Sequence, residues 1–562
     1  MVETRKKGSN ILGRIGRPIA ILIAIAAVLF ARFQIFSDRE KLLAVLAVAD
    51  FVNSFVDSTK FNTEKNPFLA NNYAPVAEEN IDAATDIIEG KIPKDLSGLF
   101  LRIGPNQIPG HFTRRYHLFD GHGMLHAIRV TPSGEIKYTN QFLRTPRYIL
   151  EKELNRSVFL LLGELTGIVG LLKIIFIHPF INRFTKLSTL YLGTANTAII
   201  QHNSKLFALH EGALPFQIKW NDANHSIESL GYESLNNQLN YAVTAHGKVD
   251  PVDGGWYFNG YDIMKEKGSL KHGYITSDSK LASYYEMEIP VKSFTHDFLI
   301  TEHYCLHFES SIIFSPEGIV AGEMFNFASD HKLRVGVAPK NSSSPSQVLW
   351  FEAPSSYALV HALNAWEEVD PVTGALEVVL WAPLDDSFGG GWQKSSRFRM
   401  HELRLNLGTG KTTVIVIDEN LLVEFPRWHP QLTGRKAPFG FGTKFQIDYN
   451  KGWGWDLNGC AKFDILNRSV VGVVSVPEGY SNGECVVIPK QTGKELRMDE
   501  IKSDAVYLGT LAHKNGEKVS EWFVFDGETM AEKPVLRVRL PARVPYGFHG
   551  EWVSETDLQL MQ

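Results

Sequence analysis

The sequence predicts an all-β protein built from consecutive antiparallel hairpins. Residues 399–418 show the pattern: apolar residues alternate in RMHELRLNL, a GTG turn follows, and the β-branched run TTVIVID returns. The same arrangement of strand, turn and strand recurs at 370–383 and at 521–541. Repeated hairpins favour a propeller, a barrel or a sandwich, and a chain of 562 residues favours the propeller.

The composition is that of a large globular protein, with 44% hydrophobic and 21% charged residues. A formal net charge of -5, without a basic run in the body of the chain, argues against a nucleic-acid partner. Cys305, Cys460 and Cys485 are widely spaced and form no CxxC pair, so we expect no disulfide framework, as in a reducing compartment. No GxGxxG follows a strand and no GxxxxGK[ST] occurs, so no nucleotide cofactor is expected.

The amino terminus differs from the rest of the chain. Basic residues between positions 5 and 17 precede the uncharged run IAILIAIAAVLFA at 19–31. This run is shorter than the roughly 20 residues that span a bilayer as a helix. We interpret residues 1–36 as a targeting sequence or a membrane anchor, with a buried helix as the alternative. Residues 37–78 form an amphipathic stretch and a polar linker, and residues 79–562 are expected to form the β-domain.

One long apolar segment interrupts the strand pattern. Residues 147–181, RYILEKELNRSVFLLLGELTGIVGLLKIIFIHPFI, have nearly helical spacing and are too long for a turn. They could form an internal core helix, because a hydrophobic helix is usually buried. Alternatively, a surface insertion spanning 147–190 dips its apolar face into a membrane, with Lys173 and Arg183 at the rim. The second interpretation would indicate a lipid substrate.

Four single histidines lie among apolar neighbours at expected strand ends or turns. Each one alone is most simply a hydrogen-bonded core residue, and their gaps of 50, 65 and 188 residues form no local metal motif. The inner strands of a propeller converge on one axis, however, so distant histidines can meet around a metal ion. The four are His246 in YAVTAHGKVDP, His296 in KSFTHDFLITEHY, His361 in YALVHALNAWE and His549 in RVPYGFHGEWV.

A rival pair is His307 and Glu309 in LHFES, which share one face of a strand and would be half of a two-His, one-carboxylate iron site. An HxE pattern arises easily by chance, so we interpret these two as a packing or solvated pair. His122 in FDGHGM is expected to be a turn residue.

Blocks of sequence from about Ile92 to Val553 resemble those of carotenoid cleavage oxygenases, the family of plant carotenoid-cleaving enzymes and animal retinoid enzymes. The order of the blocks along the chain is also the same as in that family. Two positions depart from the plant pattern: Gly247 replaces a usual Pro, and His122 a usual Asp. The blocks are GLFLRIGPNQ, HLFDGHGMLHAIRV, LFALHEGALPF, TAHGKVDP, FTHDFLITEHY, VHALNAWEE, EFPRWHP, GECVVIP and PYGFHGEWV.

This resemblance implies a seven-bladed β-propeller with an apolar cap insertion and Fe(II) on its axis. Imidazole alone suits zinc, copper and nickel as well, so the choice of iron rests on the resemblance. The implied reaction adds O2 across one conjugated C=C bond of a carotenoid or apocarotenoid and gives two carbonyl products. The resemblance assigns the metal to His246, His296, His361 and His549, and the support of their second ring nitrogens to Glu211, Glu424 and Glu484.

Three alternatives stay open. The same iron scaffold could cleave stilbenes, or it could act as a retinoid isomerohydrolase, although the Pro-Asp-Pro-Cys-Lys motif of that branch is absent. The chain could also be a lipid-binding propeller without catalysis. We expect membrane association through 147–181 and the amino-terminal segment, at a plastid, where plants make carotenoids, or at the endoplasmic reticulum.

Overall fold

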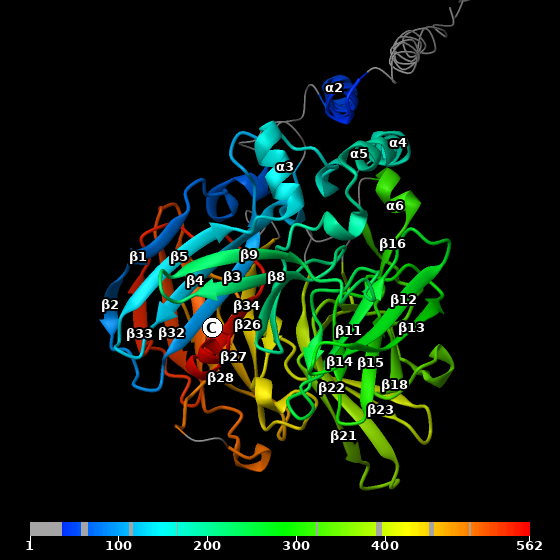
Figure 1. The fold of residues 1–562 in the computed structure, drawn as a ribbon. Helices are drawn as coiled ribbons and strands as arrows, with labels where there is room; N and C mark the ends of the chain where they lie inside the picture. The colour runs from blue at the N-terminus through cyan, green and yellow to red at the C-terminus, as the bar shows by residue number, and fades with distance from the viewer. Residues whose placement is uncertain are drawn as a thin grey trace, which may run out of the picture.

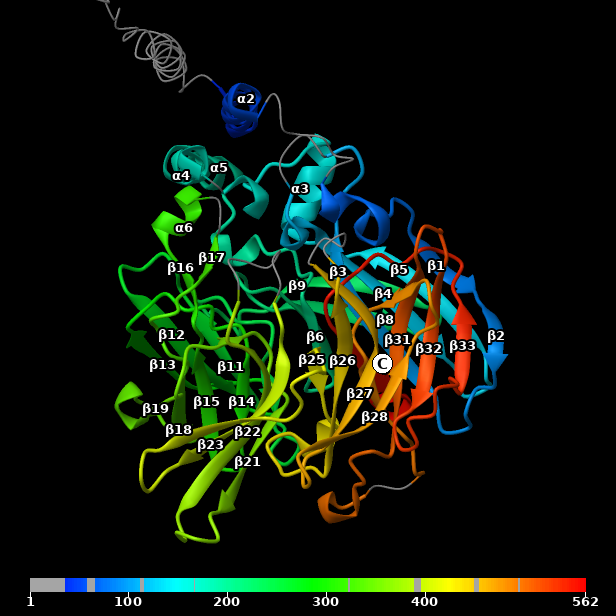
Figure 2. The same ribbon diagram turned by 180° about the vertical axis from the view of Figure 1, so that it is seen from behind.

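The protein is a seven-bladed β-propeller, as the resemblance predicted. Seven antiparallel sheets of four to six strands surround a central axis, and a cluster of helices covers one end (Figures 1 and 2). The structure, a computed structural model, describes residues 36–57, 66–111, 116–165, 167–321, 324–388, 396–448, 454–493 and 496–561. The expected targeting or anchor segment therefore lies almost wholly outside the described residues.

The two ends of the chain close the ring of blades. The carboxy-terminal strand β34 pairs with β3, with Leu99 opposite Val553. In the neighbouring blade β2 pairs with β33. The blade that contains β34 has the order β1-β5-β4-β3-β34, and its strands are β1 (Asn80–Ala84), β3 (Gly98–Asn106), β4 (His122–Val130), β5 (Ile136–Phe142) and β34 (Gly550–Ser554).

The other blades follow one another along the chain. The second blade consists of β6 (Ala198–His202), β7 (Lys205–Leu209), β8 (Phe216–Asn221) and β9 (Ser226–Tyr232). The third consists of β10 (Lys248–Val249), β11 (Trp256–Tyr261), β12 (Gly268–Ile275) and β13 (Leu281–Ile289). The fourth consists of β14 (Phe298–Ile300), β15 (Tyr304–Glu309), β18 (Arg334–Pro339) and β19 (Leu349–Glu352). A separate ribbon pairs β16 (Ile312–Phe314) with β17 (Phe325–Phe327).

The last three blades contain the predicted hairpins. Strands β23 and β24 pair across the GTG turn, and β32 and β33 pair across the turn after Asp526, which confirms these two hairpins. The strands are β20 (Ala358–Leu359), β21 (Asn364–Val369), β22 (Leu376–Asp385), β23 (Arg399–Asn406) and β24 (Thr412–Val416); β25 (Val423–Arg427), β26 (Phe439–Ile447), β27 (Trp455–Asp464) and β28 (Ser469–Ser475); and β2 (Asp86–Gly90), β29 (Tyr480–Asn482), β30 (Val486–Pro489), β31 (Val506–Lys514), β32 (Ser520–Asp526) and β33 (Leu536–Arg539).

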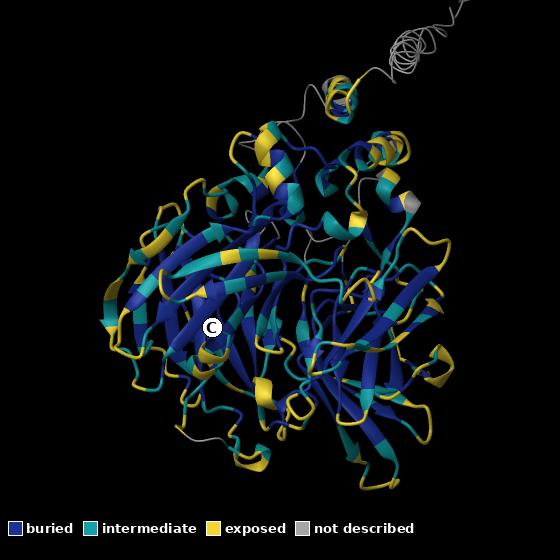
Figure 3. Ribbon diagram, in the orientation of Figure 1, coloured by how far each residue is buried: buried dark blue, intermediate teal, exposed yellow. Residues whose placement is uncertain are grey.

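The hydrophobic core lies between adjacent blades. Inner strands are buried on both faces because each sheet packs against two neighbours, so every residue of β3 and β4 is buried. Phe100 of one blade contacts Trp522 of the next, with ring centroids 5.4 Å apart. Figure 3 shows the buried inner strands and the exposure of the turns at the periphery.

The cap consists of α3 (Pro146–Leu154), α4 (Gly167–Phe176) and α5 (His178–Thr185), with α6 (Pro316–Ala321) beside α4 and α2 (Asp38–Asp57) against α5. Helix α2 buries Leu42 and Leu46 against Ile181 and Phe184 of α5. Among the described residues no helix is both long enough and apolar enough to cross a membrane. The short helix α7 (Glu555–Leu560) follows β34.

Two expectations from the sequence are wrong. Lys173 is not at a membrane rim: it is buried, with its Nζ 3.1 Å from Glu164 Oε1. Its charge is compensated by a carboxylate from the preceding turn, which a helical pattern does not reveal. Cys460 and Cys485 form a disulfide. They are 25 residues apart and become neighbours only because the β27 blade packs beside the segment leading into β30.

Candidate metal centre

Four histidines from four blades meet at the centre of the propeller. Each lies in the connection next to an inner strand: His246 two residues before β10, His296 two before β14, His361 between β20 and β21, and His549 directly before β34. One ring nitrogen from each lies within 4.8 Å of the others. His361 lies in residues 360–363, which connect two strands that both pair with β22, so it stands at a strand end as the sequence predicted.

Three carboxylates contact the second ring nitrogen of three of these histidines. His361 Nδ1 donates to Glu424 Oε2 at 2.6 Å, and His549 Nδ1 donates to Glu484 Oε1 at 3.0 Å. His296 Nδ1 lies 3.1 Å from Glu211 Oε1, which also accepts the Ala245 amide. Such contacts fix the tautomer and orientation of an imidazole. Among the described residues no carboxylate lies within ion-pair distance of His246.

The charges at the centre are balanced by a buried network. Burial alone would raise the pKa of Glu484, but Arg427 and His549 hold it well below its usual value. Arg427 donates two hydrogen bonds to this carboxylate, at 2.9 and 2.8 Å. Burial lowers the pKa of His549 to about 4 and holds the pKa of His246 well below its usual value. Burial also opposes the charged form of His361, but Glu424 raises the pKa of His361 overall. Two of the four rings are therefore neutral at pH 7, as ligation requires.

The residues present fit a metal ion. When Nδ1 donates to a carboxylate, the lone pair of a neutral imidazole is on Nε2. The Nε2 atoms of His296 and His361 face each other at 3.2 Å, and Nε2 of His246 is buried without a hydrogen-bond partner among the described residues. Opposed lone pairs repel unless a cation lies between them. Four convergent imidazole nitrogens suit iron, zinc, copper or nickel.

Aromatic rings hold two of the imidazoles from one side. Phe294 stacks on His296 with ring centroids 4.8 Å apart, and Phe425 stacks on His361 at 5.3 Å. Phe425 has a φ of +50°, in a register shift of β25 between Glu424 and Arg427. A left-handed backbone is costly for a phenylalanine, and such strain is typical of functional sites. This bulge turns Glu424 and Phe425 toward the same ring.

A cavity of about 710 Å³ opens beside these rings on the side of the helical cap. We call it the apolar chamber. It reaches His296, His361 and His549 and extends to the segment 188–190, directly after α5. Its other lining residues include Phe119, Leu162, Tyr241, Tyr261, Met264, Phe314, Met324, Phe325, Val360, Trp455 and Phe548.

Comparisons with known proteins identify the family. The family model described as retinal pigment epithelial membrane protein matches residues 73–554. The chain belongs to this family. Carotenoid 9,10(9',10')-cleavage dioxygenase 1 of Phaseolus vulgaris is 32% identical over 516 residues, which cover 88% of this chain and 90% of the relative. A chloroplastic 9-cis-epoxycarotenoid dioxygenase of Arabidopsis thaliana is 30% identical over 501 residues, covering 87% and 82%. The resemblance to carotenoid cleavage oxygenases drawn from the motifs is thereby confirmed.

Solved structures with 21–22% sequence identity share the fold. Pseudomonas brassicacearum lignostilbene dioxygenase superposes with a TM-score of 0.73 at 22% identity, covering 88% of this chain and all of the other. The cobalt-substituted Synechocystis apocarotenoid oxygenase gives a TM-score of 0.70 at 21% identity, covering 87% and 98%.

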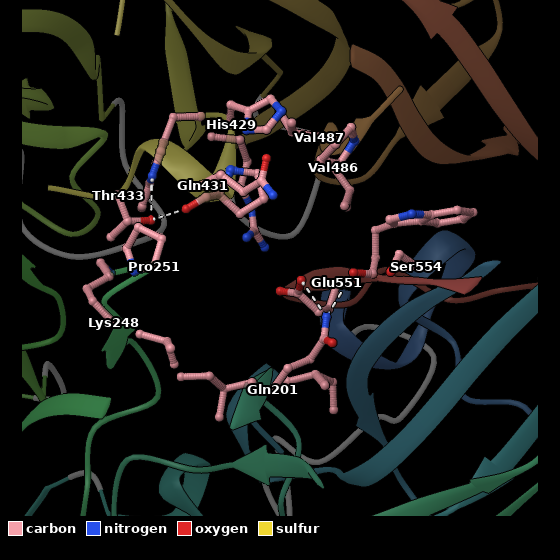
Figure 4. A pocket seen from close by; sticks show the side chains of 18 of the residues that line it. Gln201, Lys248, Pro251, His429, Gln431, Thr433, Val486, Val487, Glu551 and Ser554 are labelled. Carbon is pink, nitrogen blue, oxygen red and sulfur yellow. Dashed lines mark hydrogen bonds between the residues drawn. The ribbon is translucent and has the colours of Figure 1, made fainter. Parts of the chain in front are cut away.

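A second cavity, of about 1080 Å³, also borders the four-histidine cluster, and Figure 4 shows side chains that line it. We call it the axial chamber, because residues from all seven blades line it and the blades surround the axis of the propeller. It reaches His246, His361 and His549. Each blade contributes at least one lining residue, on its inner strand or next to it: Glu551 (β34), Gln201 (β6), Lys248 (β10), Asp297 (before β14), Ala362 (after β20), Arg427 (β25) and Val486 (β30).

The rival pair from the sequence is structural. His307 and Glu309 are fully buried within the β15 blade, as the packing interpretation predicted. His307 contacts Tyr285 and Asn259, and Glu309 accepts a hydrogen bond from Arg334 at 2.7 Å. His122, by contrast, is not a simple turn residue. It is buried at the start of β4, with its Nε2 2.8 Å from Glu151 of α3.

Sequence reasoning missed several residues of the centre. Phe294 stands two residues before His296, and Phe425 directly follows Glu424, so each was adjacent to a residue already singled out. Asp297 accepts hydrogen bonds from Lys248 at 2.6 Å and from the Ala362 amide at 2.8 Å, which joins three blades. No pattern in the sequence signals this contact, since its partners lie 49 and 65 residues away.

Proposed function

We propose that this chain is an Fe(II)-dependent dioxygenase that cleaves one conjugated C=C bond of a carotenoid or apocarotenoid. One carbon–carbon double bond and one O2 molecule are consumed, and two C=O groups are formed, so no further reductant is needed. The observation that carries the proposal is a cluster of four convergent imidazoles, three of which line the inner end of the apolar chamber. The named activities of the curated relatives support the same reaction class.

Each part of the site has a role in this proposal. His246, His296, His361 and His549 would hold the iron, and Glu211, Glu424 and Glu484 would orient three of the rings. When bound, Fe(II) supplies the redox chemistry that O2 requires. The apolar chamber would bind the polyene and exclude water, because its wall is largely aromatic and aliphatic. Phe294 and Phe425 would restrict the position of the polyene beside the imidazoles, and this restriction would select the double bond that is cleaved.

The test is product analysis under ¹⁸O2. The full-length chain in detergent, loaded with Fe(II), is given carotenoids, apocarotenals and hydroxystilbenes, and the products are identified by mass spectrometry. We expect two labelled carbonyl fragments from a carotenoid or apocarotenoid and none from His361→Ala. Cleavage of the stilbenes alone would replace the proposed substrate, and unlabelled products from iron-loaded protein would contradict dioxygenation.

We further propose that the cap places the mouth of the apolar chamber on a membrane. Leu172, Ile175 and Phe176 of α4 are 46%, 52% and 62% exposed, and Phe180 of α5 and Val320 of α6 extend the same exposed apolar surface. Exposed apolar side chains on adjacent helices are typical of a membrane-contacting surface. The chamber wall at 188–190 directly follows α5, so a substrate dissolved in lipid would have a short path into the protein.

Replacing Leu172, Ile175 and Phe176 together by serine should weaken binding to liposomes. It should also slow turnover of vesicle-embedded substrate while leaving turnover of detergent-dissolved substrate unchanged. An equal loss with both substrates would mean that these residues serve the fold. The matched control replaces Val369 and Val372, which are 61% and 91% exposed on the β21–β22 hairpin.

A plastid remains our proposal for the location of that membrane. The chloroplastic names of relatives from Arabidopsis thaliana and rice support it over the endoplasmic reticulum. A fusion of residues 1–36 to a fluorescent protein tests this directly, because a plastid signal would carry the reporter into plastids.

A further inference from the structure

The axial chamber and the apolar chamber give the four-histidine cluster two different approaches. At its inner end the axial chamber is lined by His246, His361 and His549, and at its outer end by exposed residues such as Gln431 and Pro251. Residues from 489–493 and 496–502 also line it, and Figure 1 shows these orange parts of the chain at the end opposite the helical cap. An ion in solvent could therefore reach the imidazoles without passing the cap.

The apolar chamber is a poor path for a hydrated divalent cation. Near the imidazoles its wall includes Phe294, Phe314, Phe325 and Phe425. The carboxylates beside these rings, Glu211 and Glu424, already contact His296 and His361, so a hydrated ion would lose its water there and gain few free ligands. Moving an ion from water into apolar surroundings costs several kcal/mol or more. The axial chamber offers polar side chains along its length, including Gln201, Thr433 and Glu551, which Figure 4 labels.

The charges inside the axial chamber favour a cation. Lys248 is neutralised by Asp297, with Nζ and Oδ1 2.6 Å apart, and Arg427 is neutralised by Glu484. Glu551 makes no salt bridge among the described residues, and its Oε1 accepts a hydrogen bond from Gln201 Nε2 at 3.4 Å. Lys248 and Arg427 are thus each paired with a carboxylate, whereas Glu551 has no ion-pair partner among the described residues; Lys490, which also lines the chamber together with Lys502, pairs with Asp526. Figure 4 shows Gln201 and Glu551 together at the chamber wall.

We propose that the axial chamber is the route by which Fe(II) enters the four-histidine centre, with Glu551 as a carboxylate that receives the ion on the way. This inference rests on the proposed metal-binding role of the histidines. The substrate and the metal would then enter by different paths: the polyene enters from the cap, and the ion enters from the opposite end of the propeller. It also assigns a function to the larger cavity that the cleavage reaction does not use.

The test measures how fast metal-free protein takes up Co²⁺, a probe that is stable in air and whose visible absorption reports ligation. The chain contains three cysteines; Cys305 is buried and the other two form the disulfide, so one introduced cysteine can be labelled selectively. Gln431→Cys with a bulky maleimide narrows the axial mouth. Met264→Cys, at a position 76% exposed on the wall of the apolar chamber, narrows that mouth. Gln347→Cys is the matched control, an exposed glutamine in another short helical turn.

We expect labelling at Gln431→Cys alone to slow uptake at least about tenfold. We expect Glu551→Gln to slow uptake about tenfold, as loss of electrostatic attraction does, with the final stoichiometry unchanged. Slower uptake with Met264→Cys, or no difference among the three labelled proteins, would overturn the route. The final stoichiometry tests the metal centre separately: unlabelled protein that binds no Co²⁺, or binds it equally after His361→Ala, would contradict the proposed function and not merely the route.

Discussion

Substitutions of Glu424 test how strongly the carboxylate that contacts His361 supports metal binding. Glu424 is 1% exposed, and its carboxylate accepts from His361 Nδ1 at 2.6 Å and from the Phe425 amide. A hydrogen bond to a charged acceptor contributes about 1.5–3 kcal/mol, and a neutral one about 1 kcal/mol. Glu424→Gln keeps an acceptor but loses the charge, so it should cost about 1–1.5 kcal/mol of metal binding, or roughly tenfold in affinity.

Glu424→Ala removes the acceptor altogether. His361 is then oriented only by its stacking on Phe425, whose left-handed backbone has also lost its hydrogen bond to the carboxylate. The whole charged hydrogen bond of about 2–3 kcal/mol is lost, which corresponds to a decrease in affinity of roughly 30- to 150-fold. The graded order of wild type, glutamine and alanine is therefore part of the prediction.

The assay is equilibrium competition for Co²⁺ or Fe(II) between the metal-free protein and a chelator of known affinity. The matched control is Glu402→Gln. Glu402 of β23 is also buried, but it pairs with Arg404 of the same strand and with Arg468 from the β27–β28 turn, and no hydrogen bond or ion pair among the described residues joins it to a ligand histidine. Wild-type affinity in Glu424→Ala, or an equal loss in the control, would refute the reasoning.

Three further predictions concern the cap, the disulfide and the chamber. Arg147 and His122 overcome the effect of burial and hold the pKa of Glu151 at about 2, so this carboxylate stabilises the fold above pH 4.5 and loses that effect as the pH falls toward 2. Glu151→Gln should therefore lower the free energy of unfolding by about 3 kcal/mol at pH 7 and by only about 1.4 kcal/mol at pH 3, and a pH-independent difference in urea unfolding would contradict the pairing. Cys460→Ser should cost about 3 kcal/mol of stability, the value expected for a loop of this length, and a thermal unfolding temperature equal to that of the oxidised wild type would argue against the bridge. Ala242→Phe narrows the apolar chamber and should raise KM for long polyenes while metal affinity stays unchanged; equal KM values for long and short substrates would exclude this wall from binding.

Local patterns predicted the local structure of this chain well. The hairpins at 399–418 and 521–541 follow from alternation and turn residues that lie next to each other in sequence, and the structure contains both. The blade count came only from the family resemblance, because the seven sheets show no repeated sequence signature. The closure of the ring by β34 beside β3 depends on strands more than 400 residues apart, which no window on the sequence can detect.

The residues that sequence reasoning misread share one cause. Lys173 was assigned to a membrane rim because its own helix is apolar, but its partner Glu164 lies in the preceding turn. The disulfide and the Asp297 contacts join neighbouring blades, so they depend on how sheets pack and not on any spacing. His122 was placed in a turn, yet Glu151 of the cap holds it at the start of β4. Side chains with a partner in another layer of the fold are those whose roles a single sequence conceals.

His246 differs from the other three histidines in its surroundings. His296, His361 and His549 each have a carboxylate at Nδ1, whereas His246 has none among the described residues and lines the axial chamber but not the apolar one. Two imidazoles are therefore fixed by hydrogen bonds to carboxylates before a metal binds, and a third lies 3.1 Å from a carboxylate oxygen. His246 faces the chamber through which we propose that the ion arrives. The least constrained ligand lies on the side where the ion is still hydrated, so it is the ring best placed to turn and take up the ion first. His246→Ala should then slow Co²⁺ uptake more than it weakens the final complex, whereas His361→Ala should weaken the complex more.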